Sequence, residues 1–288
     1  MIQYSLLRLN SERANLLFER RRTMAVYSKE DWQMHPIGGN TGKAFMGVRH
    51  DEKVFFKRNT SPFIAALSAT GIAPKLKWTQ RTYSGDILTA QEWKDGSLLT
   101  KENMQDEAVI QLIKDIHEST FLLNRLKFVE GKVCRPLDLI DLYFQDLAPS
   151  LHTHLFFNQI ISHLEDSIDD DFYDVDYVVC HGDLNHNNFL VDSDQQLFLV
   201  DWDNVRIADP ISDITLLLCQ YYNPSEWMDW FELYDFEITE SFSKRVTWYS
   251  LMSCLFLAKQ YFNENRHYKL NETILLLKNI FENQPEDI

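Results

Sequence analysis

The sequence has no apolar run of about 18 residues, the length that a membrane helix needs, and no uninterrupted apolar segment of signal-peptide length near its start. We therefore expect neither a membrane span nor export, and a cytoplasmic protein. Cysteine is also scarce. The 4 cysteines are scattered, and none forms a CxxC pair or a His/Cys metal-binding spacing. This distribution predicts buried, reduced thiols.

Basic residues are outnumbered by acidic ones, 28 to 43, which gives a net charge of -15. This charge disfavours a nucleic-acid footprint and is compatible with cationic or neutral substrates. The length of 288 residues and the 45% hydrophobic content allow one large domain or two lobes. Residues 1–23 differ from the rest in being basic and weakly amphipathic, and Met24 could be the natural start. We treat residues 1–27 as an N-terminal extension, with a nucleic-acid or membrane role as a less favoured alternative.

The most informative stretch is HGDLNHNNFLVDSDQQLFLVDWD, residues 181–203. Apolar segments flank the turn-rich DSDQQ, which predicts a loop followed by a β-hairpin with DWD at its exit. Asp183 is suited to accept the proton of an attacking hydroxyl, and Asn188 and Asp201 are suited to hold Mg²⁺ on the phosphates of a nucleotide. A solvated Asp/Asn turn between two strands would leave the His-Gly-Asp order and the second acidic cluster unexplained.

A second candidate element lies nearer the N-terminus, where a glycine-rich turn leads into β-like segments at residues 44–48 and 54–57. The turn matches neither GxGxxG nor the Walker motif, so it predicts a phosphate-covering loop only in combination with the downstream stretch. The residues expected to cover ATP there are Gly38, Gly39, Asn40, Thr41 and Gly42. Lys57 follows at the position where kinases place the lysine that pairs with nucleotide phosphates; an exposed strand-end lysine is the alternative.

The spacing HGDxxxxN, followed by a hairpin and DWD, resembles the aminoglycoside phosphotransferase and choline/ethanolamine kinase family. That resemblance implies an α+β, two-lobed protein-kinase-like fold, with a small antiparallel β N-lobe at residues 28–93 and a mainly helical C-lobe at residues 94–288. It further implies an adenine contact at the backbone near Glu92 and Trp93. Asp203 would reach a second metal or the substrate, and His181 would support the loop through Asp213 or a backbone carbonyl.

One departure from the kinase pattern concerns the helix after Lys57. The segment TSPFIAALSAT, residues 60–70, contains no glutamate to pair with that lysine. Lys57 would then use another carboxylate, such as Asp201, or contact phosphate directly. Beyond it, we expect strands at residues 71–78 and 87–93, a turn at residues 94–96, helices over about 100–116 and 151–168, and a helical, aromatic-rich remainder. Thr100 or Asn103 would cap the first helix, and His117 reads as a structural histidine.

Motifs outside the catalytic stretch resemble one branch of the family, the CcrZ/YtmP-like bacterial cell-cycle regulator kinases. They are KAFMG, NTSP, IAP, AQEW and DWD. The resemblance implies a small-molecule hydroxyl acceptor of nucleoside or ribose type and a cell-cycle protein partner. Choline/ethanolamine or aminoglycoside phosphorylation is one alternative, through an aromatic cage or through acidic C-lobe residues. A catalytically weak nucleotide-binding scaffold is the other.

Overall fold

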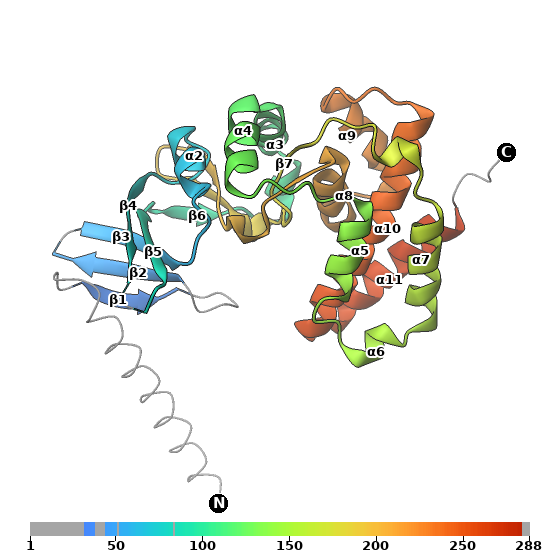
Figure 1. Ribbon diagram of the computed structural model, residues 1–288, viewed down its shortest axis with the longest axis horizontal. Helices are drawn as coiled ribbons and strands as arrows, with labels where there is room; N and C mark the ends of the chain where they lie inside the picture. Colours follow the sequence, from blue (N-terminus) through green and yellow to red (C-terminus); the bar gives the residue numbers. More distant parts are fainter. Residues whose placement is uncertain (1–31, 38–43, 51, 83, 284–288) are drawn as a thin grey trace, which may run out of the picture. The chain divides into compact units, whose positions relative to one another are not determined.

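The computed structural model describes residues 32–37, 44–50, 52–82 and 84–283, which form two compact units that divide between Asp95 and Gly96 (Figure 1). The expected extension and the glycine-rich turn lie outside the described residues. The first unit is built on an antiparallel sheet and the second is mainly helical, so the expected α+β class is confirmed. No helix among the described residues is long and apolar enough to cross a membrane.

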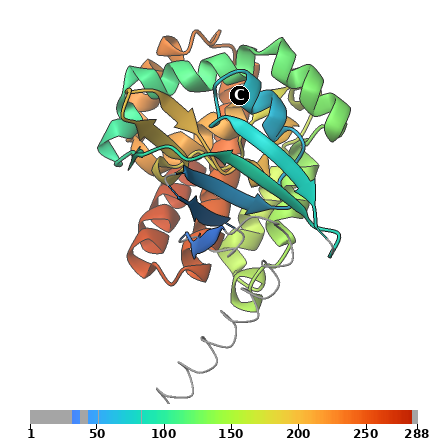
Figure 2. The same cartoon turned by 90° about the vertical axis from the view of Figure 1, so that its left-hand side faces the viewer.

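The N-terminal unit contains a 5-stranded antiparallel sheet in the order β1-β2-β3-β5-β4 (Figure 2). Its strands are β1 Gln33–Pro36, β2 Ala44–Arg49, β3 Glu52–Arg58, β4 Leu76–Arg81 and β5 Ile87–Glu92. Helix α2, Ile64–Ala69, follows β3. Lys57 lies on β3 opposite Ala44 and Thr89, and its side chain is buried. The hairpin expected at residues 44–57 is therefore present.

Apolar residues on one face of the sheet make the core of this unit, as alternation along the strands requires. They are Phe45, Val54, Phe56, Leu88 and Ala90. The rings of Trp32 and Trp78 each lie 5.5 Å from the Phe56 ring, and Gly47 leaves room for that ring because an added Cβ would come within 2.2 Å of it. This packing fixes β3, the strand that carries Lys57.

The expectation of a strand over residues 71–78 is wrong at its start. Residues 71–75 contain no strand, and β4 instead runs from Leu76 to Arg81. Gly71 has φ 79° and ends the turn after α2, and Ala73 N–H donates to the Leu67 carbonyl at 3.3 Å. A residue in the left-handed region breaks an extended segment, so the chain folds back on the helix before the strand begins.

The described part of the C-terminal unit holds five short β strands and a helical bundle. Strands β6 Gly96–Leu98, β8 Phe189–Asp192 and β9 Leu197–Leu199 form one sheet, and β7 Val178–Cys180 pairs with β10 Arg206–Ala208. The helices are α3 Glu107–Glu118, α4 Thr120–Val129, α5 Pro136–Phe144, α6 Pro149–His152, α7 Leu155–Asp166, α8 Pro210–Tyr221, α9 Trp227–Leu233, α10 Glu240–Asn263 and α11 His267–Glu282.

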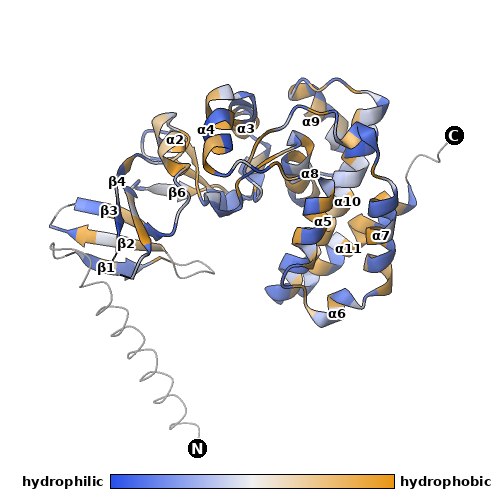
Figure 3. Ribbon diagram, viewed as in Figure 1, coloured by the Kyte–Doolittle hydropathy of each residue, from blue (hydrophilic) through white to orange (hydrophobic). Residues whose placement is uncertain are grey.

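Helix α10 is the core of the bundle and packs against α5, α7, α8 and α11. Figure 3 draws the apolar residues of these helices in orange. Leu251, Leu255 and Ala258 on α10 are fully buried, as are Leu217 and Leu218 on α8. Burial of each of these leucine side chains is worth about 1.5–3 kcal/mol. The bundle therefore gives α8, which carries one side of the candidate site, a rigid support.

Three sequence expectations for this unit are corrected. Thr100 and Asn103 hydrogen-bond to each other at 2.9 Å and stabilise the 3₁₀ turn Glu102–Gln105, so they do not cap the helix, which starts only at Glu107. The helix expected over residues 151–168 is two helices, because His154 turns the chain and its Nδ1 accepts from Phe157 N–H at the start of α7. All 4 cysteines are free, but only Cys180 and Cys254 are buried.

Candidate active site

The loop between β7 and β8 gathers polar side chains around Asp183. The Asn185 side-chain amide donates to Asp183 Oδ1 at 2.8 Å. The Asn188 amide donates to the Asp183 carbonyl at 2.8 Å and to Oδ2 at 3.2 Å. Both carboxylate oxygens are thus held by neutral donors, which orient the group without forming an ion pair. A carboxylate fixed in this way can accept a hydrogen bond and a proton from a hydroxyl.

The β8–β9 hairpin brings the second acidic element back to this loop. Strand pairing sets Phe189 opposite Leu199, and Val200 N–H donates to the Asn188 carbonyl at 2.8 Å. Asp201, the next residue, has φ 64° and ψ 57°, a left-handed conformation that turns the chain into the 3₁₀ helix Trp202–Asn204. The hairpin therefore returns the chain to the loop at Val200, with Asp201 as the next residue, and the predicted hairpin is present.

His181 links the loop to the end of the hairpin through its ring. Its Nε2 lies 3.0 Å from the Val200 carbonyl, and its Nδ1 accepts from Asp183 N–H at 3.3 Å. A ring that donates from Nε2 and accepts at Nδ1 is neutral. Burial lowers the pKa of His181, against the pull of nearby carboxylates, which agrees with that state. Trp202 packs edge-on against the ring at 4.7 Å.

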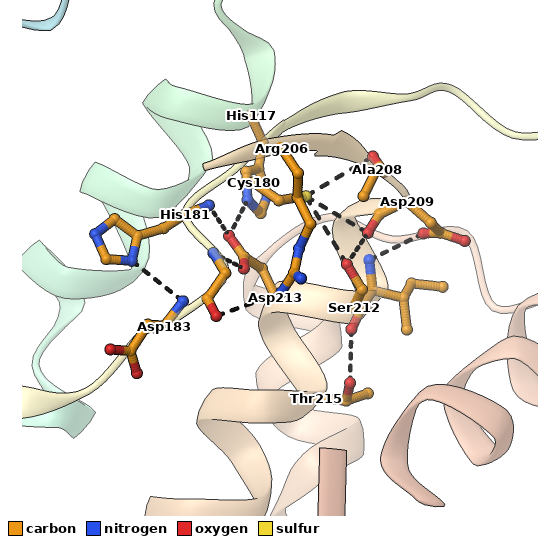
Figure 4. Close-up of polar contacts among 12 residues, drawn as sticks. His117, Cys180, His181, Asp183, Arg206, Ala208, Asp209, Ser212, Asp213 and Thr215 are labelled. Atoms are coloured by element: carbon orange, nitrogen blue, oxygen red, sulfur yellow. Dashed lines mark hydrogen bonds and ion pairs between the residues drawn. The ribbon is translucent and has the colours of Figure 1, made fainter. Parts of the chain in front are cut away.

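Asp213 lies on the first turn of α8, and its carboxylate binds main-chain N–H groups at the start of the loop (Figure 4). Its Oδ2 accepts from His181 N–H at 2.6 Å, and its Oδ1 accepts from Gly182 N–H at 2.7 Å. His117 Nε2 lies 3.4 Å from Oδ2, while its Nδ1 lies 2.6 Å from the Tyr234 hydroxyl. His181 was expected to reach Asp213 or a backbone carbonyl; its side chain uses the carbonyl, and its main chain uses Asp213.

The buried group of His117, Cys180 and Asp213 has ligand atoms within 4.8 Å of one another. Its hydrogen bonds account for it without an ion, because the Asp213 carboxylate already receives main-chain N–H groups on both oxygens. Burial also raises the pKa of the Cys180 thiol well above its ordinary value, and this thiol donates to the Ala208 carbonyl at 3.7 Å. This group therefore supports the loop.

Gly182 occupies a position that excludes any side chain. Its φ is +81°, and an added Cβ would come within 2.4 Å of the Asn204 carbonyl and 2.9 Å of Arg206 Nη2. The Gly182 carbonyl itself lies 3.3 Å from that Arg206 nitrogen, which donates to it. The close approach of the two loops therefore depends on glycine.

We expect Gly182→Ala to destabilise the protein by about 3 kcal/mol or more, because left-handed strain of about 1–2 kcal/mol adds to a clash with main chain. Turnover should fall with it. Gly85→Ala is the matched control, since Gly85 has φ +91° but nothing within 4 Å of an added Cβ. Denaturant unfolding and ATP consumption would be measured for both. Equal losses of stability would show that the close approach at Gly182 is unimportant.

The other sequence-predicted residues belong to different segments of the chain. Lys57, Glu92 and Trp93 belong to the N-terminal unit, whereas Gly38 to Gly42 lie outside the described residues. Asp203 lies in the 3₁₀ turn after Asp201 and is exposed. Sequence reasoning missed Asn185, whose place two residues after Asp183 in HGDLN was the available signal.

The comparison with known proteins decides the family. Residues 54–238 match the model of the phosphotransferase enzyme family named APH. The match covers more than half of the chain. The chain belongs to this family. It is therefore a phosphotransferase of the kinase-like type, as the HGD spacing predicted.

Solved structures agree on the fold of this phosphotransferase. Choline kinase LicA from Streptococcus pneumoniae matches with TM-score 0.66 and 14% identity, covering 94% of this chain and 99% of that one. A choline/ethanolamine kinase family protein from Mesorhizobium loti matches at 0.59 and 17%, covering 94% and 96%. The GDP complex of aminoglycoside 2′-phosphotransferase-IIIa matches at 0.60 and 13%, covering 93% and 98%. The expected protein-kinase-like fold is confirmed.

Proposed function

We propose that this phosphotransferase moves the γ-phosphoryl group of ATP, bound with Mg²⁺, to a hydroxyl of a small molecule, with a nucleoside or ribose-type acceptor as the best candidate. The observation that carries the proposal is the Asp183 carboxylate held on both oxygens by Asn185 and Asn188. Neutral amides orient the carboxylate without neutralising its charge. Asp183 then orients the acceptor hydroxyl and takes its proton as the phosphoryl group moves.

The donor set beside Asp183 fits a hard cation. The Asn188 amide nitrogen is engaged by Asp183, which leaves Oδ1 without a partner among the described residues and available as an oxygen ligand. Asp201 adds a carboxylate, and Mg²⁺ prefers such oxygens. When bound there, Mg²⁺ would neutralise charge on the nucleotide phosphates. Asn188 thus has two functions, orienting Asp183 through its nitrogen and holding the metal through its oxygen.

The nucleotide would also be bound by the N-terminal unit. We assign phosphate contact to Lys57 and to the glycine-rich residues 38–42, and adenine contact to the backbone near Glu92 and Trp93. LicA has been solved in complex with AMP, with TM-score 0.68 to this chain and 14% identity, which supports nucleotide binding on this fold. A role in cell-cycle or replication-initiation control, with a protein partner, stays a prediction drawn from sequence resemblance.

An acceptor screen tests the proposal. The protein would be incubated with Mg-ATP and one candidate at a time, and mass spectrometry would detect a gain of one phosphate. The candidates are adenosine, D-ribose, choline, ethanolamine and kanamycin. We expect phosphorylation of adenosine or D-ribose. Phosphorylation of choline, ethanolamine or kanamycin alone would replace the proposed acceptor class, and ATP binding without any product would favour a nucleotide-binding scaffold.

A further inference from the structure

The C-terminal end of α8 hydrogen-bonds to the loop between β7 and β8 at a second place. This place lies after Asp183, whereas Asp213 binds the loop before it. Gln220 Nε2 donates to the Leu184 carbonyl at 3.3 Å. The Tyr221 hydroxyl accepts from His186 N–H at 3.0 Å and lies 2.7 Å from His186 Nδ1. The loop that carries Asp183 is therefore held by α8 on both sides of that residue.

The Tyr221 contacts fix the protonation of the His186 ring. A phenol has one proton, and the hydroxyl oxygen is already the acceptor for the His186 main-chain N–H. The phenol proton has no other acceptor among the described residues, so we assign the short contact to Nδ1 as the phenol donating, which makes Nδ1 the acceptor, without a proton of its own. The neutral imidazole therefore holds its proton on Nε2, the tautomer that the partner of the other nitrogen sets.

His186 Nε2 has no partner among residues 32–37, 44–50, 52–82 and 84–283. The ring is half-buried, so part of it remains accessible. The two ring nitrogens lie on different edges, so Nε2 points away from Tyr221. His186 comes directly after Asn185, whose side-chain amide donates to Asp183. An N–H donor with no protein partner thus lies in the loop that carries the proposed proton acceptor.

The charges and rings around His186 narrow what such a donor can bind. Lys101, Glu102 and Arg266 lie close enough to act on it electrostatically. The Arg266 guanidinium lies 4.7 Å from the centre of the Tyr261 ring and also pairs with Glu264 at 3.1 Å. This face of the Tyr261 ring is therefore occupied by the protein's own cation and is not open to a quaternary ammonium. This environment favours a neutral, oxygen-rich molecule.

We propose that His186 binds the acceptor, donating a hydrogen bond from Nε2–H to a second oxygen of a neutral polyhydroxylated molecule, and that Tyr221 holds the ring in the tautomer that makes this possible. The inference rests on the proposed function and deepens it. His186 is a specificity-determining residue in this account, while Tyr221 is a positioning residue. Neither is assigned a part in moving the proton, which stays with Asp183.

Kinetics with adenosine and D-ribose as probes test the binding role. We expect His186→Phe to raise KM by about 5–10-fold, the effect of one lost hydrogen bond, and to change kcat by less than about 3-fold. His186→Gln should restore most of the loss, because the glutamine amide nitrogen reaches the place of Nε2. Tyr221→Phe should raise KM in the same direction. Tyr222→Phe is its control, since the Tyr222 hydroxyl donates to the Met104 carbonyl at 3.2 Å and not to the loop.

Imidazole ¹⁵N spectra test the tautomer without any acceptor. The His186 signal, assigned by its loss in His186→Gln, should show protonated Nε2 and bare Nδ1, and Tyr221→Phe should mix the two tautomers. A protonated Nδ1 in the wild-type protein overturns the inference, as does an unchanged KM in His186→Phe. Failure of the wild type to phosphorylate either probe counts against the proposed function, and the spectrum still decides the tautomer.

Discussion

Asp183→Asn should lower kcat by about 10³-fold, within the range of about 10²–10⁴ that general-base catalysis contributes. The amide cannot take the proton of the acceptor hydroxyl. Its oxygen can still accept from Asn185 or Asn188, so the loop keeps most of its hydrogen bonds. ATP binding should therefore be nearly unchanged while turnover collapses. Steady-state product formation, with ATP affinity measured separately, checks both parts.

Asp194→Asn is the matched control for that substitution. Asp194 is exposed in the turn of the β8–β9 hairpin, so the same chemical change is made in the same segment without touching the site. It should leave kcat within about 2-fold of wild type, as surface substitutions usually do. If Asp183→Asn retained more than a tenth of wild-type turnover, Asp183 would not be the proton acceptor.

Asp213→Asn should have the largest effect on stability, about 3–5 kcal/mol, the usual cost of breaking a buried charged network. The carboxylate is fully buried and accepts from His181 N–H and Gly182 N–H on different oxygens. An asparagine would turn an NH₂ group toward one of these donors, leaving it unsatisfied. Denaturant unfolding measures the loss. Asp115→Asn, at an exposed position on α3, is the control and should cost less than about 0.5 kcal/mol.

The same residue gives stability a pH dependence. Burial acts to raise the pKa of Asp213, but the hydrogen bond with His117 and the charge of Arg206 help to hold the pKa below its ordinary value. A carboxyl with a depressed folded pKa stabilises the protein above about pH 4 and loses that contribution as the pH falls further. The free energy of unfolding of the wild-type protein should fall on acidification below about pH 4. The share of this fall that comes from protonation of Asp213 should be missing in Asp213→Asn. Parallel acid-unfolding curves would contradict the account.

The elements that the sequence predicted well are those whose signals are local. DSDQQ between two apolar segments predicted the β8–β9 hairpin, because turn residues and strand residues alternate within a short window. The HGD spacing predicted that Asp183 and Asn188 lie together, since a short loop brings them within reach. Local patterns failed at β4, where a left-handed Gly71 delayed the strand.

Long-range partners could not be read from the sequence. His117 and Asp213 are 96 residues apart, and Tyr221 and His186 are 35 apart, so only the packing of α3 and α8 against the loop brings them into contact. The sequence indicated a structural role for His117, which ends an apolar helical stripe. Both of its ring nitrogens do have partners. No sequence signal indicated that the Tyr221 hydroxyl contacts both the main-chain nitrogen and the ring Nδ1 of His186.

The central claim is that the terminal phosphoryl group of ATP goes to a hydroxyl of a small molecule. The most direct measurement uses ATP labelled with ¹⁸O on the γ-phosphate, adenosine and D-ribose as acceptors, and mass spectrometry of all products. The account predicts labelled phosphate on an acceptor and ADP in equal amount, with both lost in Asp183→Asn. Label found only in inorganic phosphate, or acceptor phosphorylation that survives in Asp183→Asn, would contradict it.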